Sequence, residues 1–437
     1  MTVVFRDVEV SGRCVDVRVD GATVAEVGED IDAGGAEEVD GRGGALLSGL
    51  HDHHVHLLAM AAADRSVELA GLADGAAIAG ALRAADASLP AGVWLRAVGW
   101  HGPQLDRVAL DAAVAERPVR VQHRSGALWV LNTRALDALG LDAPDGRLFR
   151  MDDVLRTRVP PEATPDVAAV GRRLASYGLT GVTDATPTDR PTDIALLERS
   201  GLDVLAMSAP ALPFDGNGPA KILVEDHALP SIDDLVEQMR SARASRRRIA
   251  VHCVTAASLV LALAAFDVVG VERGDRVEHG SVIPDDVVSA LATRQLTVVT
   301  QPNFIAERGD DYLAEVEDSD QPFLYRCRSL LDAGVPVAFG TDAPFGDADP
   351  WKAVAAAVNR RTAGGATVLA EEAVDPVTAL SRFLSPADEP GGPPRRVETG
   401  AEADLVLLDA PLGEMLAEPS AERVRMTLGA GEVLFCR

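Results

Sequence analysis

The sequence ALLSGLHDHHVHLL occupies residues 45–58 and contains four of the nine histidines of the chain. In an extended strand alternate side chains lie on one face. Both imidazoles therefore point the same way in the pair His51 and His53, and also in the pair His54 and His56. Two histidines on one face at a strand end provide half of a metal site. The plainer interpretation is a polar, histidine-rich turn that follows a buried strand.

Length and composition describe a soluble globular protein. The chain has 437 residues, of which 47% are hydrophobic and 25% are charged. An α/β barrel takes about 250 residues, which leaves room for an accessory part. The formal net charge is −26. Because a polyanion would repel such a surface, we expect neither nucleic acid nor an anionic membrane as a partner. A solvated surface is the simpler explanation of the acidity.

The cysteines are scattered and show no Cys-x-x-Cys spacing, so neither a zinc ribbon nor a disulfide framework is predicted. The N-terminal sequence MTVVFRDVEV lacks an apolar signal-peptide core. No stretch reaches the roughly 18 uninterrupted apolar residues of a membrane span. These features predict a protein of the reducing cytoplasm. The cysteines are Cys14, Cys253, Cys327 and Cys436.

Both ends of the chain show the period-two alternation of short antiparallel strands. Residues 1–44 alternate apolar and polar between Gly-containing turns, and residues 400–437 repeat this pattern. Residues 385–399 are rich in proline and glycine at their start, which predicts a stiff linker. We therefore expect one small β-sandwich built from both termini.

Residues 45–384 alternate apolar strand-like runs with helical stretches, which is the pattern of a parallel sheet. Eight consecutive strand-helix units that close on themselves form a TIM barrel. An open doubly wound sheet is the alternative, but the chain has neither a Gly-x-Gly-x-x-Gly motif nor a P-loop. The expected strands are the run that precedes His54 and the runs 180–184, 203–209, 221–224, 249–253, 276–279, 296–301 and 335–342.

An insertion over residues 88–160 is expected to cap the barrel after its first strand. It contains three of the four tryptophans of the chain. Trp100, His101 and His123 are candidates for lining a substrate pocket. Packing in a hydrophobic core is the commoner role of such aromatic residues.

The predicted barrel strands carry metal-binding residue types at their carboxyl ends, where TIM barrels place their active groups. Any one of these residues could be structural, but their joint occurrence on five strands is a stronger signal. Neutral imidazoles and a carboxylate suit zinc or a similar ion. The residues are His54 and His56 on the first strand, Lys221 on the fourth, His252 on the fifth, His279 on the sixth and Asp342 on the eighth.

The order His-x-His, Lys, His, His, Asp resembles that of the binuclear amidohydrolases. The local sequences resemble the branch of family-three amidohydrolases that contains N-substituted formamide deformylase. The resemblance covers nearly the whole chain, and its first motif selects His54 and His56 over His51 and His53. The sequences are Gly49-Leu50-x-Asp52-x-His54-x-His56, Val277-Glu278-His279-Gly280, Thr300-Gln301-Pro302 and Gly340-Thr341-Asp342-Ala343-Pro344.

The resemblance implies a TIM barrel that holds one or two divalent ions, with zinc expected. It implies that one ion is bound by His54, His56 and Asp342, and the other by His252 and His279. Lys221, carboxylated by carbon dioxide, would bridge both ions. Asp342 would also transfer a proton during hydrolysis.

The chain departs from the family pattern at two places. The loop 225–230 after Lys221 is shorter than usual in the family, which predicts a different substrate pocket. A single ion remains the alternative if Lys221 is not carboxylated. Ser48 replaces the usual proline before Gly49, which we expect to have little effect.

These features predict a metal-dependent hydrolase that cleaves a non-peptide C–N bond of a small molecule, with Gln301 as a further substrate contact. A deaminase or a lactone or phosphoester hydrolase is the alternative, because the same activated water attacks other electrophiles. A catalytically silent ligand-binding scaffold is the alternative outside the enzymes. Homo-oligomerisation is left open.

Two neighbouring features receive a structural interpretation. Cys253 follows His252 on the fifth strand and should face away from the site, because strand neighbours alternate. The basic run Arg246-Arg247-Arg248 precedes that strand. It is expected to be a solvated helix end, with cations favoured at a helix C-terminus.

Overall fold

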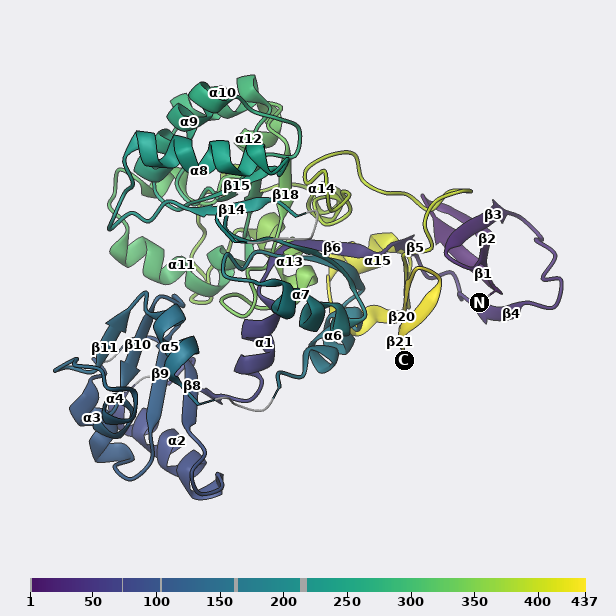
Figure 1. Ribbon diagram of the computed structural model, residues 1–437. Coiled ribbons are helices and arrows are strands. Elements are labelled where there is room, and N and C mark those ends of the chain that lie inside the picture. The colour runs from purple at the N-terminus through teal and green to yellow at the C-terminus, as the bar shows by residue number, and fades with distance from the viewer. Residues whose placement is uncertain (1, 73, 103, 161–163, 213–217) are drawn as a thin grey trace. The chain divides into compact units, whose positions relative to one another are not determined.

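The computed structural model of the protein describes residues 2–72, 74–102, 104–160, 164–212 and 218–437. The chain forms two compact units (Figure 1). The first unit contains the residues up to Leu57 and those from Val167 onward, and the second runs from Leu58 to Asp166. Among the described residues, no helix is both long and apolar enough to cross a lipid bilayer.

Two parallel sheets of three and five strands form the centre of the first unit, and each strand matches one predicted from the sequence. In spatial order, the strands of the smaller sheet are β13 (Asp203–Ala206), β12 (Leu179–Asp184) and β6 (Leu50–Val55). Those of the larger sheet are β14 (Ala220–Leu223), β15 (Ile249–Cys253), β16 (Arg276–His279), β17 (Thr297–Thr300) and β18 (Val337–Phe339).

The two sheets approach each other at both of their ends. Single parallel bridges pair Ser208 with Ala220 at one end and Val55 with Ala343 at the other. The continuous ladders therefore make two arcs of parallel strands, joined by isolated bridges.

These short strands are buried on both faces, although β6 and β16 consist mostly of polar residues. Every residue of β6, β12, β16 and β17 is buried, which is typical of parallel strands covered on both sides. Polar side chains on such strands need partners inside the protein. Asp52 on β6 and Glu278 on β16 are of this kind.

Helices alternate with the strands and cover the larger sheet. Figure 1 shows α8 (Ile232–Ala244) and α9 (Ala256–Val269) side by side next to β14 and β15. Side chains cap both helices at their first turns, where Ser231 accepts from the amide of Asp234 and Thr255 accepts from that of Ser258. Further helices of this unit are α6 (Val167–Ala175), α7 (Pro191–Leu197), α10 (Asp285–Arg294), α11 (Asn303–Glu315), α12 (Arg328–Asp332), α13 (Pro350–Asn359), α14 (Pro376–Ser381) and α15 (Leu412–Ala417).

Two four-stranded sheets contain the two ends of the chain and share one hydrophobic core. Buried Phe5 and Val17 of the first sheet belong to the same apolar cluster as Leu46, Leu405 and Leu428 of the second. The strands of the first sheet are β3 (Thr23–Gly28), β2 (Arg13–Asp20), β1 (Thr2–Val10) and β4 (Glu37–Asp40). Those of the second are β21 (Glu432–Cys436), β20 (Val424–Gly429), β19 (Leu405–Leu408) and β5 (Leu46–Ser48).

The second unit begins at Leu58, well before residue 88, where the insertion was expected to begin. Its five-stranded sheet includes a short strand that precedes this limit and pairs with the next strand, and α2 packs against the same sheet. The strands in spatial order are β11 (Arg147–Phe149), β10 (Leu128–Leu131), β9 (Val119–His123), β8 (Leu95–Trp100) and β7 (Val67–Glu68). The helices are α2 (Gly75–Ser88), α3 (Arg107–Ala113), α4 (Thr133–Leu139) and α5 (Asp152–Arg158), and α1 (Leu57–Ala63) leads into the unit.

The shared core of the terminal sheets predicts a stability effect at Leu405, which is 1% exposed. We expect Leu405→Ala to lower the free energy of unfolding by about 2–5 kcal/mol, because it removes buried apolar contact and leaves a cavity. Val433→Ala is the control, since Val433 on β21 is 45% exposed. Urea denaturation followed by circular dichroism measures both variants, and equal effects would contradict the shared core.

Candidate metal centre

The end of β6 presents His54 and His56, and backbone hydrogen bonds join it to the segment that follows β18. The amide of Asp342 donates to the carbonyl of His54 at 2.8 Å, and the amide of His56 donates to the carbonyl of Ala343 at 2.8 Å. These bonds place Asp342 beside both imidazoles although it is far away in the sequence.

A second carboxylate strengthens this connection. Asp52 on β6 is fully buried and accepts hydrogen bonds from the amide of His54 at 3.0 Å and from the hydroxyl of Thr341 at 2.6 Å. Burial raises the pKa of Asp52 to about 7, against the lowering effect of these bonds. Asp52 therefore ties the His54 backbone to the residue that precedes Asp342.

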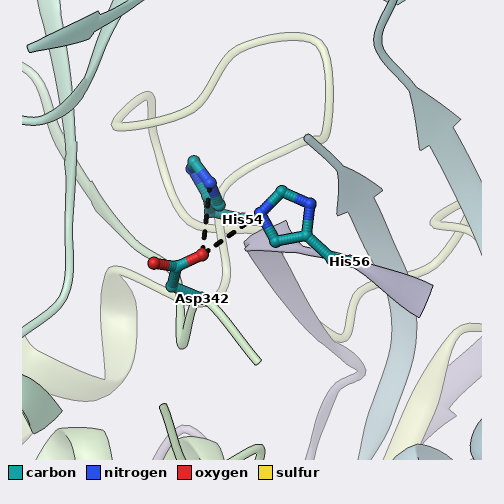
Figure 2. Close-up of side chains that lie close together, drawn as sticks. All are labelled: His54, His56 and Asp342. Carbon is teal, nitrogen blue, oxygen red and sulfur yellow. Dashed lines mark ion pairs between the residues drawn. The ribbon is translucent and has the colours of Figure 1, made fainter. Parts of the chain in front are cut away.

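His54, His56 and Asp342 form a compact group of potential metal ligands (Figure 2). The Oδ1 atom of Asp342 lies 3.5 Å from Nε2 of His54 and 3.2 Å from Nε2 of His56. One donor atom from each residue lies within 4.8 Å of the others. The three side chains therefore converge on one point, as the sequence predicted.

His56 is oriented from its other side by the end of β12. Its Nδ1 atom lies 2.9 Å from the hydroxyl of Thr186. The carboxylate of Asp184 accepts from the amides of Leu57 at 2.7 Å and Thr186 at 3.0 Å. Asp184 thereby holds together the backbone on both sides of this contact.

His252 and His279 lie next to this group. The ring centroid of His279 is 4.8 Å from that of His54 and 4.6 Å from that of His252. The structure therefore brings together all four histidines that the sequence singled out as ligands.

Gln301 at the end of β17 contacts a predicted ligand. Its Oε1 atom lies 2.9 Å from Nδ1 of His279, and its side chain is fully buried. A proton on Nδ1 would be donated to Gln301 and would leave Nε2 free as a ligand atom. The predicted contact between Gln301 and substrate stays a prediction.

Lys221 on β14 points into the protein interior and is 3% exposed. Among the described residues its Nζ atom has no hydrogen-bond partner. Its charge contributes to lowering the pKa of both His54 and His279. Burial lowers the pKa of Lys221 to about 8, and the carboxylate of Glu278 opposes this shift. A buried amine of this kind is more reactive than an exposed lysine.

Arg247 corrects one sequence-based interpretation. It is 8% exposed rather than part of a solvated helix end, because its guanidinium group donates to the carbonyls of Ser208, Gly218 and Pro219. Burial lowers the pKa of Arg247 to about 10. Gly218 and Pro219 lie directly before β14, so these contacts fix the start of the strand that carries Lys221.

The environment of Cys253 does not favour a reactive thiol. Its thiol is fully buried and lies 3.7 Å from the carbonyl oxygen of Ser258. Burial raises the pKa of the Cys253 thiol well above its usual value. The thiolate needed for nucleophilic catalysis is therefore disfavoured.

Sequence reasoning did not assign a role to Glu278, although its motif was noted. Glu278 lies 2.5 Å from Nδ1 of His54 through Oε2 and pairs with Arg276 through Oε1. Arg276 and Glu278 are two residues apart on a fully buried strand, so they share one face. Charged side chains on a buried strand need polar partners inside the fold. The sequence Arg276-Val277-Glu278 was therefore the signal that could have identified Glu278 as a functional residue.

The protonation states suit a divalent cation. Burial, assisted by the charge of Lys221, lowers the pKa of His54 to about 3, and burial also lowers the pKa of His279. Burial alone would raise the pKa of Asp342, but the hydrogen bond with His56 and the nearby imidazoles hold it below its usual range. Neutral imidazoles beside an ionised carboxylate are the ligand forms that zinc and similar ions require.

The other histidines of the first motif lie elsewhere. Nε2 of His51 is 2.9 Å from the hydroxyl of Thr183, and Nε2 of His53 is 2.9 Å from that of Ser385. Both imidazoles are buried. The structure therefore separates these two histidines from the pair His54 and His56.

The three predicted substrate contacts of the insertion lie in the second unit. The ring of His123 is 5.2 Å from that of Trp100 and 5.7 Å from that of His101. Trp100 is 4% exposed and belongs to the apolar core of this unit. This favours packing in the core over contact with substrate as its role. Contact of His101 and His123 with substrate stays a prediction.

Comparisons with known proteins identify a family that matches most of the chain. A model of the amidohydrolase family matches residues 37–435. The N-substituted formamide deformylase of Arthrobacter pascens is 24% identical over an alignment of 497 residues that covers 92% of each chain.

Solved structures show the same fold at low sequence identity. An uncharacterized metal-dependent hydrolase from Pyrococcus horikoshii has a TM-score of 0.76 at 20% identity, covering 94% of this chain and 97% of that chain. N-isopropylammelide isopropylaminohydrolase from Burkholderia multivorans has a TM-score of 0.59 at 16% identity, covering 99% and 98%. The fold is thus an α/β fold of the TIM-barrel type.

The close approach of β18 to β6 predicts a steric effect at Gly340. A Cβ atom at this position would lie 2.6 Å from Cβ of His54 and 2.7 Å from its backbone nitrogen. We expect Gly340→Ala to displace His54 and to lower turnover by about 100-fold, because a shift of about 1 Å in a catalytic group has this effect. Gly413→Ala is the matched control, since a Cβ there meets nothing within 4 Å. Steady-state kinetics on a substrate of the wild type decide, and unchanged turnover in Gly340→Ala would contradict this packing.

Proposed function

The chain belongs to the amidohydrolase family, and we propose that it is a metal-dependent hydrolase that cleaves a non-peptide C–N bond of a small molecule, most simply an amide. The observation that carries the proposal is the cluster of His54, His56 and Asp342, with the imidazole of His279 beside His54 and that of His252 beside His279. The names of two similar proteins, a formamide deformylase and an isopropylaminohydrolase, describe reactions at C–N bonds and support this class.

We assign the ligands by position. His54, His56 and Asp342 would hold one divalent ion, and His252 and His279 would hold a second. Lys221, carboxylated on its amine, would bridge the two, and the ions would be zinc. Its buried Nζ atom, which has no hydrogen-bond partner among the described residues, supports this assignment. Bound ions of this kind polarise a carbonyl group and lower the pKa of a water molecule toward neutrality.

Asp342 is the residue proposed to move protons. Its carboxylate is held ionised beside His56, and its side chain is 10% exposed, so it can meet a water molecule at the centre. It would accept a proton from the water that attacks the amide carbon. It would then deliver this proton to the departing nitrogen as the C–N bond breaks, which leaves a carboxylic acid and an amine.

The fold proposal extends the observed sheets. We propose that the eight parallel strands close into one barrel through the bridges between Ser208 and Ala220 and between Val55 and Ala343. We also propose that the terminal sheets form a β-sandwich around their shared core. The closed barrel would bring the carboxyl ends of β6, β15, β16 and β18 to one rim.

Alanine at His54 or Asp342 should abolish metal retention and turnover. Each change removes a ligand of the most compact group, and Asp342→Ala also removes the proton acceptor. Metal content is measured by plasma mass spectrometry, and turnover is measured on a panel of N-substituted formamides and other small amides. Glu432→Ala, at an exposed position of β21, is the control.

The panel also contains amine-bearing heterocycles, lactones and phosphoesters, so a deaminase or another hydrolase would be recognised by its product. Undiminished activity of either variant on a true substrate would contradict the proposal. Substoichiometric metal in wild-type protein expressed with ample metal would favour a ligand-binding scaffold.

Lys221→Met should reduce the metal content from two ions per chain to one. Methionine fills the same buried space but cannot be carboxylated or bridge two ions. Plasma mass spectrometry gives the stoichiometry, and intact-protein mass spectrometry under native conditions tests whether the wild type carries one added carbon dioxide. Two ions per chain in the variant would argue against Lys221 as the bridging ligand.

A further inference from the structure

A fully buried ion pair lies beside the proposed metal centre. Glu278 and Arg276 are both 0% exposed and lie two residues apart on β16. One carboxylate oxygen of Glu278 contacts Nδ1 of His54, and the other accepts from Nε of Arg276. The carboxylate therefore lies between a predicted metal ligand and a guanidinium group.

We propose that Glu278 is a positioning residue for His54, and that Arg276 holds Glu278 in place for this task. The proposal rests on the assignment of His54 as a metal ligand. It goes beyond that assignment because it gives the ion pair on β16 a role in the function of the site.

The first argument concerns the tautomer of His54. A neutral imidazole carries one N–H group, and an ionised carboxylate can only accept a hydrogen bond. At 2.5 Å from Oε2 of Glu278, Nδ1 must therefore carry the proton. The lone pair then lies on Nε2, the atom that faces Oδ1 of Asp342 at 3.5 Å. Glu278 thus directs the ligand atom of His54 toward the point where His56 and Asp342 converge.

The second argument concerns the contacts of Arg276. Its Nη2 atom donates to the carbonyl of His53 at 3.0 Å, while its Nε atom donates to Glu278. His53 directly precedes His54 in β6. Arg276 therefore fixes both the carboxylate that contacts the His54 ring and the backbone that carries this ring.

The third argument is the difference between His54 and its neighbours. Nδ1 of His56 contacts a hydroxyl group of Thr186, and Nδ1 of His279 contacts an amide oxygen of Gln301. Nδ1 of His54 contacts a carboxylate. An ionised acceptor raises the basicity of an imidazole ligand more than a neutral one does. The contact therefore makes His54 the most strongly supported of these three ligands.

A purely structural role would not require this arrangement. Buried ion pairs often add little stability compared with apolar residues of similar volume. Glu372 provides a structural comparison in the same unit, since it is 2% exposed and accepts hydrogen bonds from Arg326 and from the amides of Cys327 and Ser329. None of these partners is a proposed ligand, so Glu372→Gln is a matched control for the loss of a buried carboxylate.

The first experiment determines the tautomer of His54 in metal-free protein. Selective ¹⁵N-histidine labelling and nuclear magnetic resonance distinguish a protonated Nδ1 from a protonated Nε2, and His54→Gln identifies the signal. We expect Nδ1–H in the wild type and a changed state in Glu278→Gln. A protonated Nε2 in the wild type would overturn the proposal. This readout does not depend on catalysis or on bound metal, so it separates failure of the inference from failure of the proposed function.

The second experiment measures metal affinity by competition with a chelator, using Zn²⁺, and records the visible spectrum of the Co²⁺-loaded protein. We expect Glu278→Gln to weaken binding by about 10- to 100-fold, the usual effect of losing a partner behind a ligand, and to change the Co²⁺ spectrum. Glu278→Asp retains the charge and should recover part of the affinity. Glu372→Gln should lower the melting temperature but leave the Zn²⁺ affinity and the Co²⁺ spectrum unchanged.

Two results would overturn the proposal here. One is a Glu278→Gln variant whose Zn²⁺ affinity and Co²⁺ spectrum equal those of the wild type. The other is an equal loss of affinity in Glu278→Gln and Glu372→Gln, which would indicate a general effect of removing buried charge. If Glu278→Gln does not fold, the affinity of Glu278→Asp and the tautomer of the wild type decide the question.

Discussion

The structure of the centre depends on the hydrogen bonding between the end of β6 and the segment after β18. Two backbone bonds, from Asp342 to His54 and from His56 to Ala343, run between these segments, and Asp52 adds contacts to the amide and hydroxyl of Thr341. Asp52 and Thr341 are 289 positions apart in the chain. Without this junction the imidazoles of His54 and His56 would lose the carboxylate of Asp342 that lies between them.

Burial then determines the chemistry that these side chains can offer. Imidazoles removed from water stay neutral because protonation would place a charge in a medium of low polarity. The carboxylate of Asp342 stays ionised because several imidazoles and a hydrogen bond favour its charge. The same burial would be costly without a partner of opposite charge. The fold therefore keeps these side chains in the protonation states that a metal ligand requires.

The sequence predicted the strands well because most of them contain short apolar runs between helical stretches, while the polar β6 and β16 were recognised by their histidine motifs. The predicted limits of β15 and β16 agree with those observed. The four histidines that lie close together could be singled out as candidate ligands because they stand at strand ends. The interpretation of Arg247 was wrong because sequence periodicity does not show which member of a basic run meets carbonyl groups. The start of the second unit was missed because β7 has only two residues and its pairing with β8 is a tertiary contact.

Contacts between strands also explain why the sequence alone assigns no role to Glu278. The contact that gives Glu278 its importance is with Nδ1 of His54, a residue 224 positions away in the chain and on another strand. A motif such as Val277-Glu278-His279 draws attention to the histidine, since an imidazole at a strand end is the familiar ligand. The charged residue before it can be interpreted only when the residue opposite it inside the fold is known.

The charges of the interior bear on the state of Lys221. Lys221 and its charged neighbours comprise two cations, Lys221 and Arg276, and two carboxylates, Glu278 and Asp342. These charges balance when the imidazoles are neutral. Divalent ions would add positive charge to a buried region that has no uncompensated negative charge. The Coulomb energy of such an excess is large where water is excluded. Carboxylation would convert Lys221 from a cation into an anion and would offset two of the four positive charges that two divalent ions add, without any further acidic residue. A carboxylated Lys221 therefore suits a centre with two ions better than a plain ammonium group does.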